Sequence, residues 1–371
     1  MGGDYARKVD GRLREQGHDV VNRLAVIHTG AFSGTANSIT AALRERLEVV
    51  NFDLLPLARR PRKAAFRLAG LAEARKAGSG IPWSKTGTWS RALQRHLEAD
   101  GCVGPDQRVL FLQTVGAFVL DERVHYTIYT DRVGLEGAAA GGTFSSRFTP
   151  AWAARERTFL RRARHICVMG PSTKQALVEQ YRIPEQRVSV VGAGPNAPVI
   201  PTARRDRCTR LIFIGTQWEL KGGPVLLAAF KRARRAYPDL QLAIVGTEVR
   251  GKVPGGVDVV GRVPHWKVGV LLSHSDVVVI PSHMEAFGIA LLEGLLTGLP
   301  CIGSTVGNQR WIIGDAGLCV PPGDVDALVR AIARVMDNYD LYRSRALRRR
   351  EVLGVRCNWA AVAERILVSL R

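Results

Sequence analysis

The chain has 371 residues, of which 46% are hydrophobic, and it carries a formal net charge of +20 at pH 7. This length favours two domains, and this apolar content excludes an intrinsically disordered chain. No apolar run reaches membrane-spanning length and residues 1–22 lack the apolar core of a signal peptide, so we expect a cytoplasmic protein. The six cysteines are scattered without a C-x-x-C pair, which favours free thiols over disulfides or a metal site.

Strands and helices are expected to alternate in the first half of the chain. A strand at 24–28 runs into a glycine-bearing loop and a helix to about residue 47, the opening unit of a doubly wound sheet. Residues 56–100 are basic and helical in pattern, and their Trp83 and Trp89 either pack on the domain or contact an acceptor or a membrane. Further strands are expected at 49–52, 109–112, 126–129, 166–169 and 188–191, and further helices at 152–163 and 172–181, the last capped by Ser172.

Residues 192–205 are rich in glycine and proline and form the clearest linker in the sequence. A second alternation of strands and helices follows the linker, so we expect two α/β domains that face a cleft. Its strands are expected at 211–214, 242–245, 257–260, 277–280, 301–303 and 318–320, and its helices at 224–236, 266–273, 289–297, 325–337 and 359–370.

The positive charge comes mostly from arginine and is compatible with three kinds of surface. The first is an ordinary solvated surface, the second binds an anionic membrane face or an anionic substrate, and the third binds nucleic acid. The basic clusters lack the interleaved aromatic residues of a base-stacking platform, and the sequence contains no nucleic-acid-binding motif. We therefore expect no nucleic-acid partner, whereas peripheral association with an anionic membrane face remains open.

One stretch, residues 275–308, combines an apolar strand and an apolar helix with two carboxylates, Glu285 and Glu293. A carboxylate buried without a partner is costly, so each is expected to bind a polar group. Their spacing corresponds to about 12 Å along a continuous helix, which is too far for a shared proton or a glycosidase pair. The same spacing suits the two ends of a long polar ligand. Between them, the amides of residues 287–289 lie at a helix start, where a diphosphate binds favourably.

A second segment, G-T-Q-W-E-L-K-G-G at 215–223, directly follows an expected strand. Its Lys221 is a point charge suited to phosphate oxygens, and its glycines allow the backbone to approach a ligand closely. The segment is not a Walker loop, because no Lys-Ser/Thr pair opens the following helix. Alone, this segment is weak evidence for a phosphate site.

Together these segments resemble the retaining glycosyltransferases of family 4. The resemblance rests on Glu285-x7-Glu293 within E-A-F-G-I-A-L-L-E-G, on G-L-P-C-I-G-S after it, on the G-x5-K-G loop, on P-P-G-D at 321–324 and on P-S-T-K-Q-A-L near Ser172. It implies the GT-B fold, with two Rossmann-like doubly wound α/β domains facing a cleft and a C-terminal helix that crosses back to the N-terminal domain. The expected division is a polar lead-in at 1–22, an acceptor-binding domain at 23–195, a donor-binding domain at 196–350 and a crossing helix at 351–371.

The resemblance also implies roles for individual residues. Glu285 corresponds to the residue that binds hydroxyls of the donor sugar, Glu293 to the one that binds the ribose, and Lys221 to the cation that neutralises the diphosphate. Gly34 resembles the backbone that closes on the diphosphate from the other domain, and 261–263 the segment whose backbone reads the base. The expected donor site therefore comprises Gly34, Thr216, Lys221, Arg262, Val263, Glu285, Phe287, Gly288, Ile289 and Glu293, with no metal.

Two positions depart from the family pattern. Thr216 stands where many members carry an arginine after the first glycine of the phosphate loop, and Arg262 is a candidate replacement for that cation. Thr130 followed by Asp131 stands where the family often has a histidine, so Asp131 is the candidate that orients the acceptor hydroxyl. The expected catalytic set is therefore Glu285, Lys221 and Asp131.

The function implied by the resemblance is transfer of a sugar from a nucleotide-diphosphate sugar to the hydroxyl of a glycan, a lipid-linked or a small-molecule acceptor. The enzyme is expected to be a retaining, metal-independent hexosyltransferase that needs no cofactor besides its donor. One alternative is a nucleotide-sugar epimerase of the same fold, which releases no free nucleoside diphosphate. The other is a non-catalytic, basic nucleotide- or nucleic-acid-binding protein, whose biological function survives Glu285→Ala.

Overall fold

The computed structural model describes residues 23–28, 34–54, 72, 87–99, 103–104, 107–114, 120, 122–134, 150–202 and 208–370. The expectations for the lead-in at 1–22, for the loop at 29–33, for Trp83, for the side chain of Trp89 and for Cys102 lie outside the described residues. The five described cysteines, Cys167, Cys208, Cys301, Cys319 and Cys357, are free thiols.

The N-terminal half forms a six-stranded parallel sheet with the strand order β2-β1-β3-β4-β5-β6. Alternate residues of its buried strands point to opposite faces, as the pleat of a strand requires. In β1, Leu24 and Val26 pack in the cluster that contains helix α2, whereas Ile27 packs in the cluster that contains α4 and α5. The elements are β1 (Arg23–His28), α2 (Thr35–Arg44), β2 (Glu48–Asp53), α4 (Gly87–Ala99), β3 (Arg108–Leu112), β4 (Tyr126–Thr130), α5 (Pro150–Arg162), β5 (His165–Val168), α6 (Pro171–Glu179), the 3-10 turn η6 (Glu185–Arg187) and β6 (Val188–Val190).

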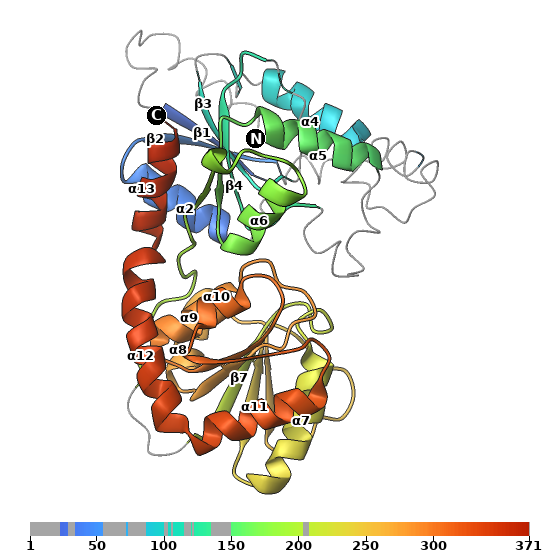
Figure 1. Ribbon diagram of the computed structural model, residues 1–371, viewed down its shortest axis with the longest axis vertical. Coiled ribbons are helices and arrows are strands. Elements are labelled where there is room, and N and C mark those ends of the chain that lie inside the picture. The colour runs from blue at the N-terminus through green and yellow to red at the C-terminus, as the bar shows by residue number, and fades with distance from the viewer. Residues whose placement is uncertain are drawn as a thin grey trace, which may run out of the picture.

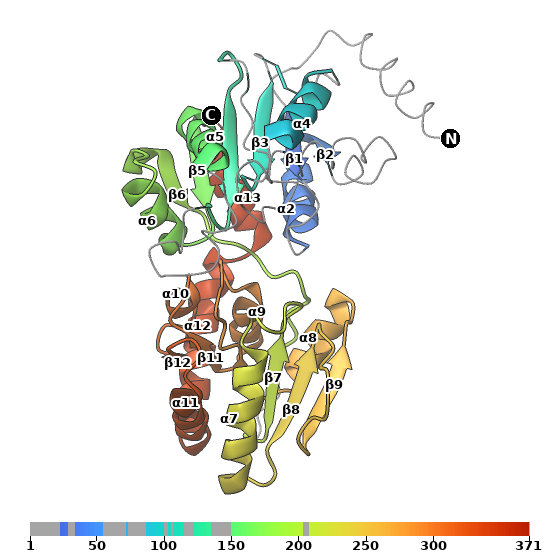
Figure 2. The same ribbon diagram turned by 90° about the vertical axis from the view of Figure 1, so that its right-hand side faces the viewer.

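The C-terminal half forms a second six-stranded parallel sheet with the order β12-β11-β10-β7-β8-β9. Figures 1 and 2 show the two sheets in separate domains, which lie end to end along the long axis of the molecule, each sheet with helices packed around it. The elements are β7 (Arg210–Ile214), α7 (Gly223–Ala236), β8 (Gln241–Val245), β9 (Val257–Gly261), α8 (His265–Ser273), β10 (Val277–Val279), α9 (Ile289–Thr297), β11 (Cys301–Ser304), α10 (Gln309–Ile313), β12 (Gly317–Val320), α11 (Val325–Asp337), α12 (Tyr339–Arg356) and α13 (Trp359–Ser369).

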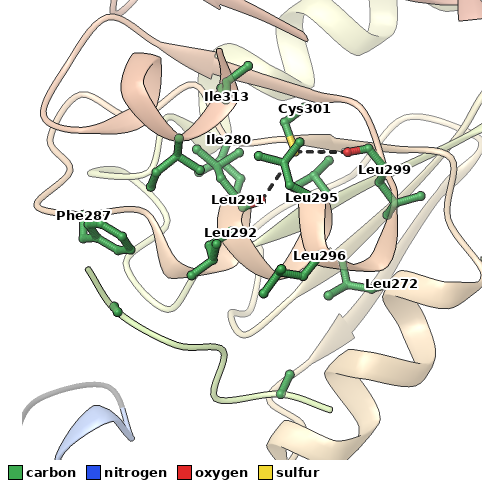
Figure 3. Packing of buried hydrophobic residues seen from close by; sticks show 14 of the residues in the cluster. Leu272, Ile280, Phe287, Leu291, Leu292, Leu295, Leu296, Leu299, Cys301 and Ile313 are labelled. Atoms are coloured by element: carbon green, nitrogen blue, oxygen red, sulfur yellow. Dashed lines mark hydrogen bonds between the residues drawn. The ribbon is translucent and has the colours of Figure 1, made fainter. Parts of the chain in front are cut away.

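Helix α9 is buried on almost every side, which explains why its sequence is apolar throughout. Leu291, Leu292 and Leu295 are fully buried, and Figure 3 shows them beside Leu272 of α8 and Ile313 of α10. Fully burying a leucine side chain contributes about 1.5–3 kcal/mol. The start of α9 is therefore fixed rigidly against the second sheet.

The last helix returns to the first domain, as the fold class predicted. Helix α12 packs along α9 of the second domain, whereas α13 packs on α2 and β5 of the first (Figure 1). Trp359 anchors the crossing, because its indole Nε1 donates a hydrogen bond of 2.7 Å to the carbonyl oxygen of Pro195 in the linker. Within the described part of the chain, no helix has both the length and the apolar character needed to cross a bilayer.

Several details of the sequence analysis differ from the structure. The short helix α10 and the 3-10 turn η6 were not expected. Helix α12 was not expected, because six arginines in its 18 residues make the segment read as a basic cluster rather than an apolar stripe. Ser172 was expected to cap α6, but it is the second residue of that helix and Gly170 is the N-cap. The prediction of a Ser172 cap is therefore wrong. The side chain of Asn308, from the other domain, accepts a hydrogen bond from the backbone amide of Ser172 at this helix start.

Candidate functional site

A cavity of about 500 Å³ lies between the two domains, at the carboxyl ends of both sheets. This is the place where open α/β sheets bind ligands. The first domain and the linker line it with Thr35, Asp131, Met169 and Asn196. The second domain contributes Ile214, Gly215, Thr216, Lys221, Val245, Gly246, Arg262, Val263, His265, Val268, Ile280, Glu285, Phe287, Gly288, Ile289, Ala290 and Glu293. The lining therefore includes every residue expected at the site except Gly34.

Lys221 and Glu285 form an ion pair in the cavity, with Nζ 2.7 Å from Oε2. The side chain of Lys221 is 23% exposed and that of Glu285 only 10%, so the pair is shielded from bulk solvent without being fully buried. Ser282 Oγ donates a longer hydrogen bond of 3.4 Å to the same carboxylate oxygen. The pair forms because β7 and β10 are neighbours in the sheet, which brings together the loops that follow them. An ammonium has three donors, so Lys221 can bind an anion while it holds Glu285.

The glycines after Lys221 allow this loop to pass close to the end of β10. Gly222 has a φ of 73°, and a Cβ there would lie 2.0 Å from the carbonyl oxygen of Pro281. A Cβ on Gly223 would lie 2.1 Å from the indole ring of Trp218. Trp218 also contacts Phe213 edge-on, with ring centroids 5.3 Å apart. Trp218 therefore packs the loop against the sheet and holds Lys221 in place.

The start of α9 faces the cavity. Its N-cap is Gly288 with a φ of 108°, a left-handed conformation that L side chains rarely adopt. The first amides of a helix have no partner within the helix, and they carry a partial positive charge. Phe287 is buried beside Trp311, with ring centroids 6.1 Å apart, and this contact fixes the turn into the helix. The start of α9 and Lys221 therefore form one electropositive corner.

Glu293 lies in the middle of α9, about one turn after the start of the helix, and is only 5% exposed. Its Oε1 accepts hydrogen bonds of 2.8 Å from the backbone amides of Asn196 and Ala197 in the linker. Burial raises the pKa of Glu293 above its usual value, and the two amides and the nearby His265 oppose that rise. The partner that a buried carboxylate requires is thus supplied in part by the chain itself.

Asp131 faces this corner from the first domain, directly after β4. Its Oδ1 accepts a long hydrogen bond of 3.5 Å from Nε2 of Gln113. The backbone of Gln113 has a φ of 69°, which is uncommon for residues other than glycine. Burial raises the pKa of Asp131, the guanidinium of Arg132 opposes the rise, and the charge of Glu285 adds to it. The negative charge of Glu285 in the second domain therefore disfavours ionisation of Asp131 in the first domain.

Gly34 lies beside the cavity rather than in its lining. It is the N-cap of α2 with a φ of 84°, and a Cβ there would lie 3.1 Å from Nε2 of His265 in the second domain. The next residue, Thr35, lines the cavity and accepts a hydrogen bond of 3.3 Å from Nδ2 of Asn196. Ser38 of α2 donates to Oδ1 of Asn196 at 2.8 Å.

The lining residues that were not identified from the sequence include Asn196, His265 and Met169. Asn196 lies in the Gly/Pro-rich linker, where a polar side chain carries no periodic signal, yet its backbone and side chain join α2 to Glu293. His265 begins α8 and approaches Gly34 across the cavity. Among the described residues, no three His, Cys, Asp or Glu side chains are grouped so as to hold a metal ion.

A family model matches part of the second half of the chain. Residues 208–338 match the sequence model of the family described as Glycosyl transferases group 1. The glycogen synthase of Mycobacterium tuberculosis is 27% identical over 252 residues, which are 64% of this chain and 60% of that protein. The phosphatidyl-myo-inositol mannosyltransferase of Mycolicibacterium smegmatis is 29% identical over 189 residues, 48% of each chain. The chain thus spans about half to three fifths of the length of these relatives.

Solved structures match nearly the whole chain. Sucrose-phosphate synthase from Thermosynechococcus elongatus superposes with a TM-score of 0.69 and 18% identity, covering 94% of this chain and 98% of that one. HepE of Anabaena, solved in complex with UDP and glucose, gives a TM-score of 0.66 and 12% identity over 94% and 99% of the two chains. These likenesses show the fold, which is GT-B. Residues 208–338 therefore match the glycosyl transferases group 1 family, within a chain that has the GT-B fold.

Proposed function

We propose that the chain is a retaining, metal-independent glycosyltransferase that moves a sugar from a nucleotide-diphosphate sugar to an acceptor hydroxyl. The observation that carries the proposal is the electropositive corner formed by Lys221 and the start of α9, with carboxylates on either side of it. A nucleotide-diphosphate sugar is anionic in its middle and has hydroxyl groups at both ends. The family match and the mannosyltransferase and glycogen synthase relatives support the same class of reaction.

In this proposal the second domain binds the donor. Lys221 and the first amides of α9 bind the diphosphate, and Glu285 accepts hydrogen bonds from hydroxyls of the sugar. Glu293 uses Oε2 for a ribose hydroxyl, since Oε1 already accepts the amides of Asn196 and Ala197. The base lies along the segment that contains Arg262 and Val263, which lines the cavity beside β9.

The chemical step places the largest charge change at the electropositive corner. The bond from the anomeric carbon to the phosphate oxygen breaks, and its electron pair goes to the diphosphate. The acceptor oxygen bonds to the anomeric carbon on the same face, and the acceptor proton passes to the departing phosphate oxygen. Lys221 and the helix amides stabilise the developing negative charge on the diphosphate. No metal ion is then needed to neutralise this charge. Asp131 orients the acceptor hydroxyl from the first domain.

The protein is further proposed to act in the cytoplasm and to associate peripherally with an anionic membrane face. Its net charge of +20 supports this, as does α12, which exposes Val352 and Val355 on an arginine-rich helix. Sedimentation with phosphatidylglycerol vesicles tests the proposal. Binding that weakens as salt increases is expected, whereas equal binding to phosphatidylcholine vesicles would contradict it.

The experiment that tests the proposed function is a thermal-stability panel of nucleotide sugars and nucleoside diphosphates. A ligand at a hundredfold excess over its dissociation constant stabilises the folded state by about 2.7 kcal/mol. At least one nucleotide sugar and its nucleoside diphosphate should raise the melting temperature, and EDTA should leave the shift unchanged. If no member of the panel raises it, the assignment of the cavity to a donor is wrong.

A further inference from the structure

The side chain of Asn308 joins the two domains beside the cavity. Its Oδ1 accepts a hydrogen bond of 2.9 Å from the backbone amide of Ser172 in the first domain. Its Nδ2 donates a hydrogen bond of 2.8 Å to the carbonyl oxygen of Ala286 in the second. Asn308 is only 1% exposed, so neither bond competes with bulk water. A single amide group therefore connects helix α6 to the loop at 282–288 that carries Glu285.

On the side of the first domain, Asn308 caps a helix that has no capping side chain at its own N-cap. The N-cap of α6 is Gly170, which has no side chain, and Pro171 follows it. A capping oxygen normally accepts the amide of the second or third helical residue. Ser172 is that second residue, so Asn308 does from the other domain what an N-cap side chain does locally.

The fit at this contact is close. A Cβ on Gly170 would lie 2.3 Å from Cγ of Asn308, so glycine at this position is what allows the amide group to enter. Asn308 is itself the N-cap residue of the short helix α10, where asparagine is a preferred cap. Its side chain is nevertheless directed to α6 instead of capping its own helix.

On the side of the second domain, the segment that carries Asn308 backs the donor loop. Gly307 has a φ of 56°, and a Cβ there would lie 2.2 Å from the carbonyl oxygen of Glu285. The backbone of 307–308 therefore lies directly against the backbone of 285–286. A second contact from the first domain reaches the same loop, because Nη1 of Arg132 lies 3.4 Å from Sδ of Met284.

We infer that Asn308 is a positioning residue and an interdomain latch: it ties closure of the two domains to the conformation of the loop that presents Glu285. A hydrogen bond accepted by Oδ1 polarises the amide group, which makes Nδ2 a better donor to Ala286. Docking of α6 onto Asn308 thus strengthens the bond that holds the loop, and a fixed loop presents Asn308 to α6. The donor role of the loop is taken from the proposed function.

Hydrogen–deuterium exchange of the ligand-free protein tests the latch without any knowledge of the substrate. Asn308→Ala removes both bonds, so exchange should become roughly fivefold faster at the start of α6 and in 282–288. Asn308→Asp keeps an acceptor for Ser172 but removes the donor to Ala286. It should therefore loosen the loop and leave the start of α6 protected.

Gly170→Ala approaches the latch from the other domain. It leaves Asn308 intact, but the added methyl group displaces the amide, so exchange should rise in the loop at 282–288 although Gly170 does not belong to that domain. Asn338→Ala, which removes an exposed hydrogen bond to Arg334, serves as the matched control and should change neither segment.

The result that overturns the inference is loop exchange in Gly170→Ala equal to that of the wild type. Unchanged exchange at the start of α6 in Asn308→Ala overturns it equally. Circular dichroism identifies any variant that fails to fold, and the remaining variants still decide the question. The thermal-stability panel is scored separately. A wild type that binds no nucleotide sugar refutes the proposed function, while the exchange data still decide whether Asn308 couples the two segments.

Discussion

Lys221→Met gives the sharpest prediction about the electropositive corner. Methionine keeps an unbranched apolar side chain against Gly215 but removes the positive charge that lies 2.7 Å from Glu285. Removing one preorganised contact to the developing charge raises the barrier by about 2–4 kcal/mol, which lowers kcat roughly 30- to 1,000-fold. The effect should fall on turnover, because the charge on the diphosphate grows as the bond to the sugar breaks.

The same substitution affects stability through the carboxylate it leaves behind. Glu285 is 10% exposed and would lose its counter-ion, which costs about 1–2 kcal/mol of unfolding free energy. Lys221→Met/Glu285→Gln should recover most of that loss, since neither charge remains. Urea denaturation and initial rates of nucleoside diphosphate release measure the two effects. Lys231→Met, at an exposed position on α7, is the matched control. A kcat for Lys221→Met within about threefold of the wild-type value would show that the Lys221 charge does not stabilise the departing diphosphate.

Three further predictions concern other parts of the structure. Because burial raises the pKa of Glu293 above its ordinary value of 4.5, the stability that this group contributes below pH 4.5 is lost as pH rises through the raised pKa. Glu293→Gln should therefore lose less stability than the wild type as pH rises above 4.5, as measured by melting temperature. Gly222→Ala should lower the free energy of unfolding in urea by about 1–3 kcal/mol or more, because the positive φ is strained for alanine and the added Cβ meets the carbonyl oxygen of Pro281. Glu156→Ala should cost about 1–3 kcal/mol in the same assay, because it leaves the buried donors of Thr114 and Gly134 without the carboxylate that accepts their hydrogen bonds; an unchanged unfolding free energy would show that the network is dispensable.

The sequence predicted the fold well where local signals were strong. Helices α9 and α11 begin and end where their periodicity and flanking residues predicted, and the β-branched runs became the parallel strands. Helix α12 was missed because its buried face rests on few apolar residues, including Tyr342 and Leu353, among many arginines. The prediction that Ser172 caps α6 was wrong because the side chain of Asn308, 136 residues away, accepts the backbone amide at the start of this helix. Such replacement of a local cap by a tertiary one has no signature in a local pattern.

The site was predictable as a set of residues but not as a geometry. The motifs identified Lys221, Glu285 and Glu293, and all three line one cavity. The ion pair between Lys221 and Glu285 depends on β10 lying beside β7, a strand order that the sequence pattern does not encode. The hydrogen bonds from the linker to Glu293 likewise depend on how the domains meet. Local chemistry therefore predicted the residues, and tertiary topology determined their partners.

The proposed reaction transfers a sugar out of a nucleotide-diphosphate sugar, and analysis of the products is its decisive test. The wild type is incubated with the nucleotide sugar that stabilises it most, together with candidate hydroxyl acceptors, and free nucleoside diphosphate is quantified by chromatography. We expect that nucleoside diphosphate and glycoside form in equal amounts, that NMR shows an unchanged anomeric configuration, and that Lys221→Met forms both products much more slowly. A nucleotide sugar with altered stereochemistry and no released nucleoside diphosphate would contradict the proposed reaction.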